Sequence, residues 1–348
     1  MSDLHGLGEF GIVDLFRNKA GGLPSGLGIG DDCAVLDQGG PQRLLVTTDM
    51  LVEGVHFLRD AITPWRLGWK SMAVNVSDVA AMAGRPVAAF LSLGLPRDYP
   101  RQDLEAFRDG LLACCREYDL VLAGGDTVSN PGGLIINVAV VGQSPADNIR
   151  YRSGARPGQL VCTAGPLGAS AAGLDYLLST DKEQEEIRRV LEPGLLEEAL
   201  AAHLEPRPQV SLGSMLGSHP AVGALIDLSD GLVAALGHVA QESGVRIALD
   251  SNLLPLAKSA RAMGSAMGKD ARSWALFGGE EYCLLFTVEP HALPALSIEV
   301  KERLGLSITT LGRVESGLPQ VLVDGRVAAG TGGWDHFSRQ PNGAQSAE

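Results

Sequence analysis

Two hydroxyls and a carboxylate stand together at Thr47-Thr48-Asp49, directly after the apolar segment 43–46. The β-branched and apolar residues of that segment predict a strand that ends at Thr48-Asp49 and gives way to a loop. Hard oxygen ligands grouped in this way suit a hard cation such as Mg²⁺. His56 follows on the same loop, so its side chain can return toward the same place. A solvated turn at a strand end is the alternative for this run alone.

Acidic groups, most of them beside glycines, recur along the chain. They fall at 30–32, 49, 78, 124–126, 227–231 and 278–281. After an expected short buried strand over 120–123, the N–H groups of Gly124-Gly125 can cradle a phosphate, and Asp126 can hold its metal ion. A plain turn is the alternative for this segment. At Asp227-Leu-Ser-Asp230, one carboxylate is explained as the N-cap of the helix that follows, and the other is not.

A helix is expected over 64–83, with Thr63 as its N-cap and Pro64 in its first turn. Ser71, Asn75 and Asp78 are spaced i, i+4, i+7, so they form one polar stripe on a mostly apolar helix. Solvated helix faces usually carry Lys and Glu instead of Ser, Asn and a single Asp. The pattern therefore favours a functional Asp78 over a surface-facing stripe.

These groups together indicate metal-dependent handling of phosphates. The chain has neither a Gly-x-x-x-x-Gly-Lys-Ser/Thr loop nor a kinase-type catalytic loop. A nucleotide site would therefore be built from metal-bound carboxylates and glycine backbone. Phosphoryl transfer suits such a site, because it needs positioning and charge neutralisation more than a protein nucleophile.

The helices and strands expected around these residues indicate an α/β protein of the α+β type. A chain of 348 residues is long for one core, so two domains are expected. Gly142 to Asn148 is interpreted as a linker between them, which gives domains 1–148 and 149–337 and a tail over 338–348. Expected helices cover 9–19, 64–83, 103–118 and 181–203 with a break at 193–194. Expected strands cover 33–36, 43–49, 87–95, 120–123, 134–141, 159–164, 224–226, 245–250, 283–288, 308–314 and 321–323.

The composition argues against several classes of binding partner and indicates the cellular compartment. The formal charge of −13, with no basic stripe, argues against nucleic-acid and anionic-membrane partners. The five cysteines are odd in number and lack CxxC spacing, which indicates buried thiols in a reducing compartment. The N-terminal residues lack the features of a signal peptide, and no apolar run is long enough to span a bilayer. A cytoplasmic protein is expected.

An ordered set of motifs resembles the thiamine-monophosphate kinases, relatives of aminoimidazole ribonucleotide synthetase and selenophosphate synthetase. The motifs are GEF at 8–10, GIGDDCAVL at 28–36, TTDMLVEGVHF at 47–57, KSMAVNVSDVAAMAG at 70–84, AGGDT at 123–127, RSGARPG at 152–158, DLSDGL at 227–232 and FGGEEY at 277–282. The resemblance runs from about Gly8 to Phe337. Each motif is modest by itself, but the ordered set is highly specific.

The resemblance implies ATP-dependent phosphorylation of thiamine monophosphate to thiamine diphosphate, by direct in-line transfer. It also implies the two-domain synthetase-like fold, with an N-terminal mixed sheet, and a homodimer joined through the N-terminal sheets. The implied Mg²⁺ ligands are Asp32, Thr47, Thr48, Asp49, Asp78, Asp126, Asp227 and Asp230, of which Asp49, Asp78 and Asp126 are the implied catalytic residues. The implied ATP contacts are Gly125, Asp126, Arg152 and Ser229, and the implied substrate contacts are His56, Glu280 and Trp334.

The chemistry of the implied substrate contacts agrees with their roles. An indole can cover a cationic thiazolium or the pyrimidine, and a carboxylate can accept a hydrogen bond from the aminopyrimidine. A hydrophobic plug is the alternative for Trp334, and a loop histidine with satisfied hydrogen bonds is the alternative for His56.

Three positions depart from the family pattern, namely Gln209, Glu281 and Cys283. The rival functions are another ATP-using member of the superfamily and a non-catalytic protein that binds nucleotide or thiamine phosphate. No cysteine precedes Cys33, where selenophosphate synthetase needs a reactive one. The chain also ends in Gln-Ser-Ala-Glu, without the terminal cysteine of hydrogenase-maturation relatives.

Overall fold

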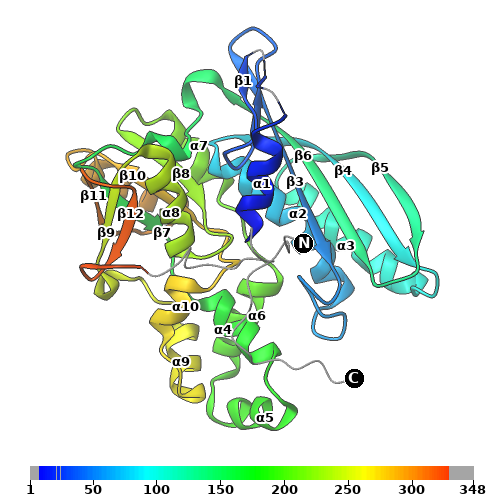
Figure 1. Cartoon of the computed structure of the whole chain (residues 1–348). Coiled ribbons are helices and arrows are strands. Elements are labelled where there is room, and N and C mark those ends of the chain that lie inside the picture. Colours follow the sequence, from blue (N-terminus) through cyan, green and yellow to red (C-terminus); the bar gives the residue numbers. More distant parts are fainter. Residues whose placement is uncertain (1–7, 21, 24, 329–348) are drawn as a thin grey trace, which may run out of the picture.

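The computed structural model describes residues 8–20, 22–23 and 25–328, which form two β-sheets with helices packed around them (Figure 1). The strands of the first sheet are β1 (Gly26–Leu27), β2 (Ala34–Leu36), β3 (Gln42–Val52), β4 (Arg85–Pro96), β5 (Val121–Asn130) and β6 (Ile135–Pro145). Those of the second are β7 (Leu160–Ala164), β8 (Val222–Asp227), β9 (Arg246–Leu249), β10 (Leu284–Val288), β11 (Ile308–Glu315), β12 (Gln320–Val323) and β13 (Arg326–Val327).

Helices connect and cover these strands. They are α1 (Gly8–Arg17), α2 (Pro64–Ala81), α3 (Arg101–Glu117), α4 (Ala169–Leu177), α5 (Asp181–Val190), α6 (Pro193–Leu204), α7 (Val210–Ser218), α8 (Leu232–Ser243), α9 (Lys258–Met267), α10 (Ala271–Phe277) and α11 (Leu293–Leu304), with short 3₁₀ turns η2 (Ala146–Asn148), η3 (Arg152–Gly154) and η4 (Ser251–Leu253). Within the described part of the chain, no helix is long and apolar enough to cross a membrane.

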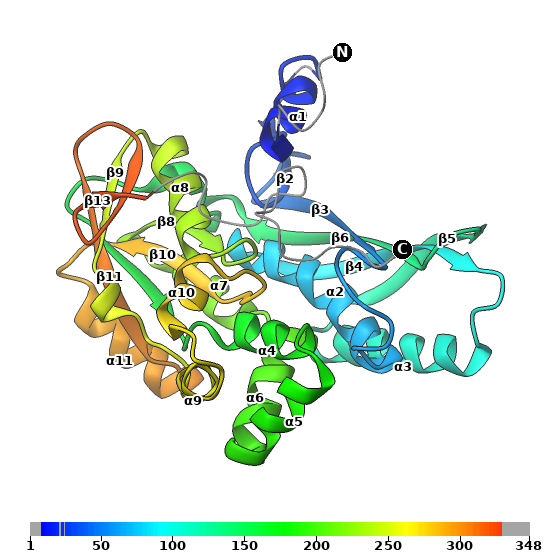
Figure 2. The same ribbon diagram turned by 60° about the horizontal axis from the view of Figure 1, so that its bottom comes forward.

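The first sheet has the order β1-β2-β3-β6-β4-β5 and is mixed, since only β4 and β5 run parallel. Helices α2 and α3 cover one face of it (Figure 2). The other face carries exposed apolar side chains such as Met50 and Phe90. We call this second face, on which Thr48 and Asp126 also lie by register, the open face.

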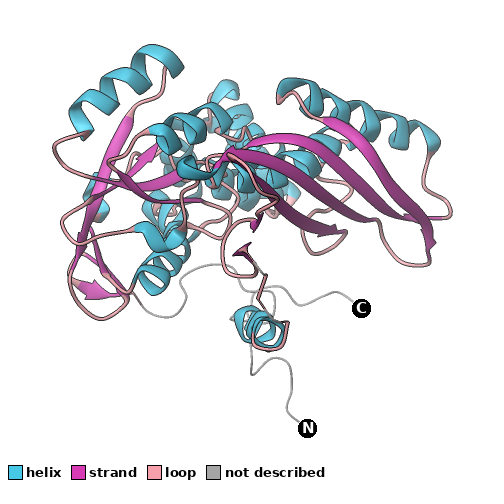
Figure 3. Cartoon of the chain, turned by 90° about the horizontal axis from the view of Figure 1, so that it is seen from above, coloured by secondary structure: helices cyan, strands magenta, loops and turns pink. Residues whose placement is uncertain are grey.

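The second sheet has the order β13-β12-β9-β11-β7-β10-β8 and is buried on both faces. Helix α8 packs on one face, and α7 and α11 pack on the other. Strand β10 shows why its sequence is a continuous apolar run: Leu285 faces the core under α8, while Leu284 and Phe286 face the core under α7. The view from above shows the two sheets side by side with helices between them (Figure 3).

Helix α2 is the element that joins the two halves. It packs against β3 and β6 of the first sheet and against α7 and β8 of the second half. Burial on nearly every side explains its many small and apolar residues. The predicted N-cap is confirmed, because Thr63 Oγ1 accepts a hydrogen bond from the N–H of Arg66 and Pro64 stands in the first turn.

Two strand predictions in the first sheet were wrong at their ends. Strand β3 does not stop at Thr48-Asp49 but continues to Val52, because β6 pairs with it along its whole length. Strand β5 is not a short buried strand over 120–123. It continues through Gly124-Gly125-Asp126 to Asn130 in parallel pairing with β4, and it is exposed because it lies at the edge of the sheet.

The predicted linker and the predicted N-cap were also wrong. Residues 142–145 belong to β6, and Ala146–Asn148 forms a 3₁₀ turn. The N-cap residue of helix α8 is Gly231, so neither carboxylate of the Asp227–Asp230 segment stands at the N-cap position. The five cysteines are buried and unpaired, as predicted.

Candidate active site

Three carboxylates from distant parts of the sequence converge between the two halves. Asp32 lies in the loop before β2, Asp78 on α2, and Asp227 at the end of β8. One oxygen from each lies within 4.8 Å of the others. Hard oxygen atoms from three residues, so close together, are the donor set that suits Mg²⁺.

Local hydrogen bonds hold these carboxylates in place. Thr47 Oγ1 donates to Asp78 Oδ2 at 2.5 Å, so this hydroxyl orients one of the carboxylates. The hydroxyl of Ser77 donates to Asp227 Oδ2. An oxygen of Asp32 pairs with the guanidinium of Arg152. Each of the three carboxylates therefore has one oxygen held by a hydrogen bond or an ion pair, and this also fixes the orientation of its second oxygen.

The cluster contains more negative charge than its cations neutralise. Burial, and then the charge of Asp32, raise the pKa of Asp227 to about 8. Burial, and then the charge of Asp49, raise the pKa of Asp78 well above its ordinary value. Asp32 Oδ2 is buried and has no hydrogen-bond partner among the described residues. A cation placed here would satisfy that oxygen and remove the repulsion, so the residues fit a bound Mg²⁺.

Asp49 and Asp230 belong to the same electrostatic group. Burial, and then the charge of Asp230, raise the pKa of Asp49 to about 6. The backbone N–H of Asp49 donates to Asn75 Oδ1 at 3.0 Å, which fixes β3 against α2. The predicted polar stripe of α2 therefore serves the site: Asn75 anchors β3, and Asp78 enters the carboxylate cluster.

Thr48 and Asp126 lie apart from the cluster within one chain. Side chains alternate along β3, so Thr48 points to the open face while Thr47 and Asp49 point inward. Its hydroxyl donates to the carbonyl of Val138 at 3.2 Å. Asp126 lies on the edge strand β5, three strands from β3, or roughly 14 Å at the usual spacing between strands. The structure therefore divides the predicted metal set between two faces of the sheet.

The glycine before Asp126 has a packing role that its sequence context did not reveal. Gly125 has a φ of +152°, and a Cβ there would lie 1.7 Å from the carbonyl oxygen of Leu91. Only glycine allows β5 to approach β4 this closely.

Arg152 is the cation that lies beside the carboxylate cluster. Its backbone N–H donates to Asp31 Oδ2 at 3.1 Å, and its Nε lies 3.7 Å from Asp31 Oδ1. Burial, and then the charge of Asp32, raise the pKa of Asp31 to about 7. Ser229 lies on the loop after β8, where its carbonyl accepts the N–H of Glu280 at 2.5 Å.

Glu280 and His56 approach each other from opposite halves of the chain. Burial alone would raise the pKa of Glu280, but the charge of Lys70 lowers it below its ordinary value, and His56 acts in the same direction. The Nδ1 atom of His56 accepts the N–H of Val52 at 3.0 Å, which holds the loop after β3 in place. Trp334 lies outside the described residues.

Sequence reasoning missed several residues that support the site. Ser77 precedes Asp78 and bonds to Asp227, but no spacing rule connects positions 77 and 227. Asp31 was visible as one of two adjacent aspartates, and its contact with Arg152 separates its role from that of Asp32. Lys70 is 1% exposed, and a lysine inside a helix of apolar residues was the available signal.

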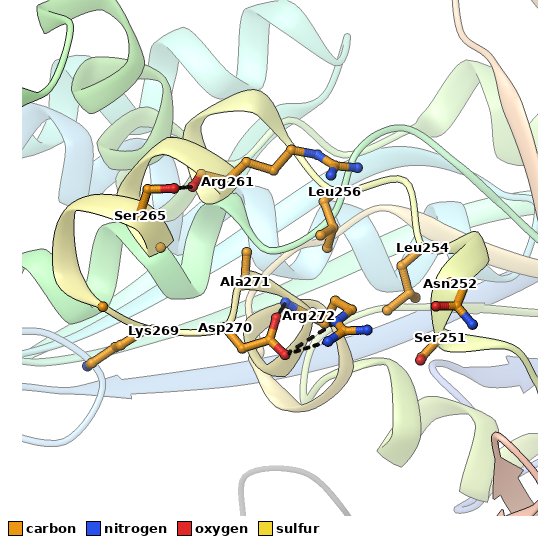
Figure 4. A pocket seen from close by; sticks show the side chains of 12 residues that line it. Ser251, Asn252, Leu254, Leu256, Arg261, Ser265, Lys269, Asp270, Ala271 and Arg272 are labelled. Atoms are coloured by element: carbon orange, nitrogen blue, oxygen red, sulfur yellow. Dashed lines mark hydrogen bonds and ion pairs between the residues drawn. The ribbon is translucent and has the colours of Figure 1, made fainter.

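A second concave region lies away from the carboxylates. A cavity of about 580 Å³ opens between η4, α9 and α10, lined by Arg261, Lys269, Asp270 and Arg272 among others (Figure 4). Arg272 pairs with Asp270, and Lys269 pairs with Asp175 outside the lining. The cavity lacks a cluster of carboxylates, so we place the chemistry at the Asp32–Asp78–Asp227 site.

Comparison with known proteins agrees with this geometry. Residues 30–144 match the family model described as AIR synthase related protein, N-terminal domain. Over 333 residues the chain is 39% identical to the thiamine-monophosphate kinase of Aquifex aeolicus, which covers 95% of this chain and 98% of that protein. The chain belongs to the thiamine-monophosphate kinase family.

Solved structures of the thiamine-monophosphate kinase family share the whole fold. A structure described as AaThiL complexed with AMPPCP and TMP is 38% identical, covers 97% of this chain and 99% of that chain, and has a TM-score of 0.83. The hydrogenase maturation protein HypE of E. coli has a TM-score of 0.62 at 21% identity, with 86% of each chain covered, and this likeness concerns the fold alone.

The three departures from the thiamine-monophosphate kinase pattern have local structural partners. Gln209 bridges two strands, since its amide donates to the carbonyl of Ala164 and accepts the N–H of Leu284. Glu281 accepts the N–H of Gly168 at 2.7 Å, at the start of α4. Cys283 is buried with its sulfur 3.8 Å from Thr163 Oγ1.

Proposed function

We propose that this chain transfers the γ-phosphoryl group of ATP to thiamine monophosphate and so forms thiamine diphosphate and ADP. The observation that carries the proposal is the convergence of Asp32, Asp78 and Asp227 into one buried cluster with an unpartnered oxygen. Membership of the kinase family supplies the two substrates.

In this proposal the carboxylates hold Mg²⁺, with Asp32, Asp49, Asp78 and Asp227 as the inner set. Asp230 lies near Asp49 and belongs to the same group. Bound Mg²⁺ would neutralise the phosphates and orient the transferring group. The hydrogen bond from Thr47 keeps Asp78 directed at the cluster.

The rest of the chain binds and orients the substrates. Arg152 and Ser229 stand beside the cluster on the nucleotide side, and His56 and Glu280 stand on the substrate side. We assign Trp334 to the thiamine moiety and Gly125 to ATP on their motif positions.

Transfer needs no covalent phosphoenzyme. An oxygen of the thiamine monophosphate phosphate attacks the γ-phosphorus in line, the bond from that phosphorus to the β–γ bridging oxygen breaks, and ADP leaves with the electron pair. Because the acceptor phosphate is already ionised near neutral pH, the protein contributes positioning and charge neutralisation instead of a strong base.

We further propose that the active protein is a homodimer joined through its first sheets. The open face exposes Met50 and Phe90, and the edge strand β5 exposes Val121 and Val128. A second chain on this face would bury them, and its approach would change the surroundings of Asp126.

We propose domains of residues 1–148 and 149–337, with a tail over 338–348, since each half contributes its own sheet. We place the protein in the cytoplasm, where ATP is available and five unpaired thiols persist.

Incubation with ATP, Mg²⁺ and thiamine monophosphate tests the proposed function. We expect thiamine diphosphate and ADP to form in equal amounts by chromatography. A non-catalytic binding protein would form neither product. Another ATP-using member of the superfamily would consume ATP without phosphorylating thiamine monophosphate, and either result would overturn the proposal.

A further inference from the structure

Glu280 is held by two buried side chains from different elements. Lys70 Nζ, on α2, lies 3.0 Å from both Glu280 Oε1 and Glu280 Oε2. The Nδ1 atom of His203, on α6, lies 3.0 Å from Glu280 Oε2. Ser170 Oγ, on α4, lies 3.2 Å from the same nitrogen. The carboxylate is therefore fixed from both halves of the chain.

The exposure of these side chains is uneven. The side chains of Lys70 and His203 are 1% and 6% exposed, while that of Glu280 is 26% exposed. One side of the carboxylate is thus covered by fixed donors, and another side remains open to a ligand. Burial, and then the charge of Lys70, lower the pKa of His203 to about 4, so the imidazole is neutral and donates to Glu280 from Nδ1.

The backbone of Glu280 adds to this arrangement. Its φ is +60°, a left-handed conformation that non-glycine residues rarely adopt, and its N–H donates to the carbonyl of Ser229. Strained backbone persists where the surroundings determine the conformation strongly, and it is concentrated at binding sites.

We propose that Lys70 and His203 are positioning residues that hold the Glu280 carboxylate with its open side toward the thiamine part of the substrate. The inference rests on the proposed function, because it assigns that ligand to Glu280. In a buried ion pair, a lysine balances the charge of one carboxylate. Lys70 also contacts both oxygens of Glu280, which leaves the Glu280 carboxylate little freedom to rotate.

Binding measured without turnover tests this role. Thiamine monophosphate is titrated calorimetrically, with no ATP present, into the wild-type protein and Lys70→Met. We expect Lys70→Met to weaken thiamine monophosphate binding about tenfold, the scale of one hydrogen bond to a charged group, and to change ATP binding less than twofold. Arg66→Met is the matched control, since Arg66 also lies on α2 and pairs with Glu197 of α6, but does not touch Glu280. It should bind thiamine monophosphate as the wild type does.

Two further comparisons separate positioning from a purely structural role. In a Glu280→Gln background, Lys70→Met should change thiamine monophosphate binding less than twofold. The double variant should still fold, because it leaves no unpaired charge buried at this position. His203→Asn, which retains a donor near the Nδ1 position, should bind close to the wild type, while His203→Leu should not.

The outcomes are distinct. If the wild-type protein binds and phosphorylates thiamine monophosphate but Lys70→Met binds it equally well, the positioning role is wrong and the proposed function stands. An equal loss of ATP and thiamine monophosphate binding, or a full Lys70→Met effect in the Glu280→Gln background, also rejects the role. If the wild-type protein does not bind thiamine monophosphate, the proposed function and the inference fail together.

Discussion

Asp78 shows how the surroundings of a single carboxylate can oppose its ionised form. It lies on a helix that is buried on nearly every side, and burial, followed by the charges of Asp49, Asp227 and Asp32, raises its pKa. The hydrogen bond from the hydroxyl of Thr47 favours the charged form. Without a cation the cluster must bind protons, whereas a divalent cation stabilises the ionised carboxylates.

Asp49→Asn should lower kcat by about 100-fold or more while the fold remains intact, because it removes the charge of a proposed metal ligand but keeps the backbone bond to Asn75. Steady-state rates and far-UV circular dichroism check this. Asp37→Asn, in the neighbouring turn and paired with Arg43, is the control and should retain wild-type activity. Near-normal turnover by Asp49→Asn would remove this residue from the mechanism.

At the scale of elements, the sequence predicted which residues lie together better than it predicted the strand ends around them. The spacing of Ser71, Asn75 and Asp78 marked the helix that carries Asp78 into the carboxylate cluster, because helical periodicity is a local property. The ends of β3 and β5 were missed because pairing with β6 and β4 decides them. Contacts such as that between Lys70 and Glu280 join residues 210 positions apart, and no local pattern encodes them.

The start of α4 provides a test of how Glu281 acts. Burial raises the pKa of this carboxyl to about 8, from an ordinary value of 4.5. Because the pKa of Glu281 is raised in the folded protein, its contribution to the free energy of unfolding is fully present below pH 4.5 and is lost as the pH rises through 8. Glu281→Gln does not titrate, so its melting temperature relative to wild type should rise by several degrees between pH 5 and pH 8.5, on the order of 2 °C per kcal/mol.

Glu183→Gln is the matched control for Glu281→Gln, since Glu183 also caps a helix but is exposed. Hydrogen bonds from Thr180 lower its pKa, so its stabilisation is present above 4.5 and lost only as pH falls. This variant should therefore melt below the wild type by a constant amount between pH 6 and pH 8.5. Calorimetric curves for Glu281→Gln that stay parallel to wild type would reject the assignment.

At the scale of the whole molecule, the site depends on how the two halves meet. Asp32 and Asp78 come from the first half and Asp227 from the second, and α2 lies between the sheets that carry them. The open face of the first sheet carries exposed apolar residues and ends in an edge strand, and it is the surface through which we propose that two chains associate.

The mass in solution tests that assembly. Light scattering after size-exclusion chromatography should give about twice the chain mass of 36.4 kDa. Phe90→Lys together with Val128→Lys should give the monomer, because both place charge on the exposed surface of the sheet. A wild-type monomer, or a dimer that both lysines leave intact, would place the contact elsewhere.

Proton release on metal binding tests the central claim most directly. In the metal-free protein, Asp227 and Asp31 have pKa values of about 8 and about 7, so at pH 7 the cluster carries bound protons. Mg²⁺ must displace them, and titration calorimetry in buffers of different ionisation enthalpy counts them. We predict release of at least about one proton per chain at pH 7, falling toward none at pH 9.5, and no such release in Asp227→Asn combined with Asp78→Asn. Mg²⁺ binding without proton release at pH 7, or unchanged release in the double variant, would contradict the account.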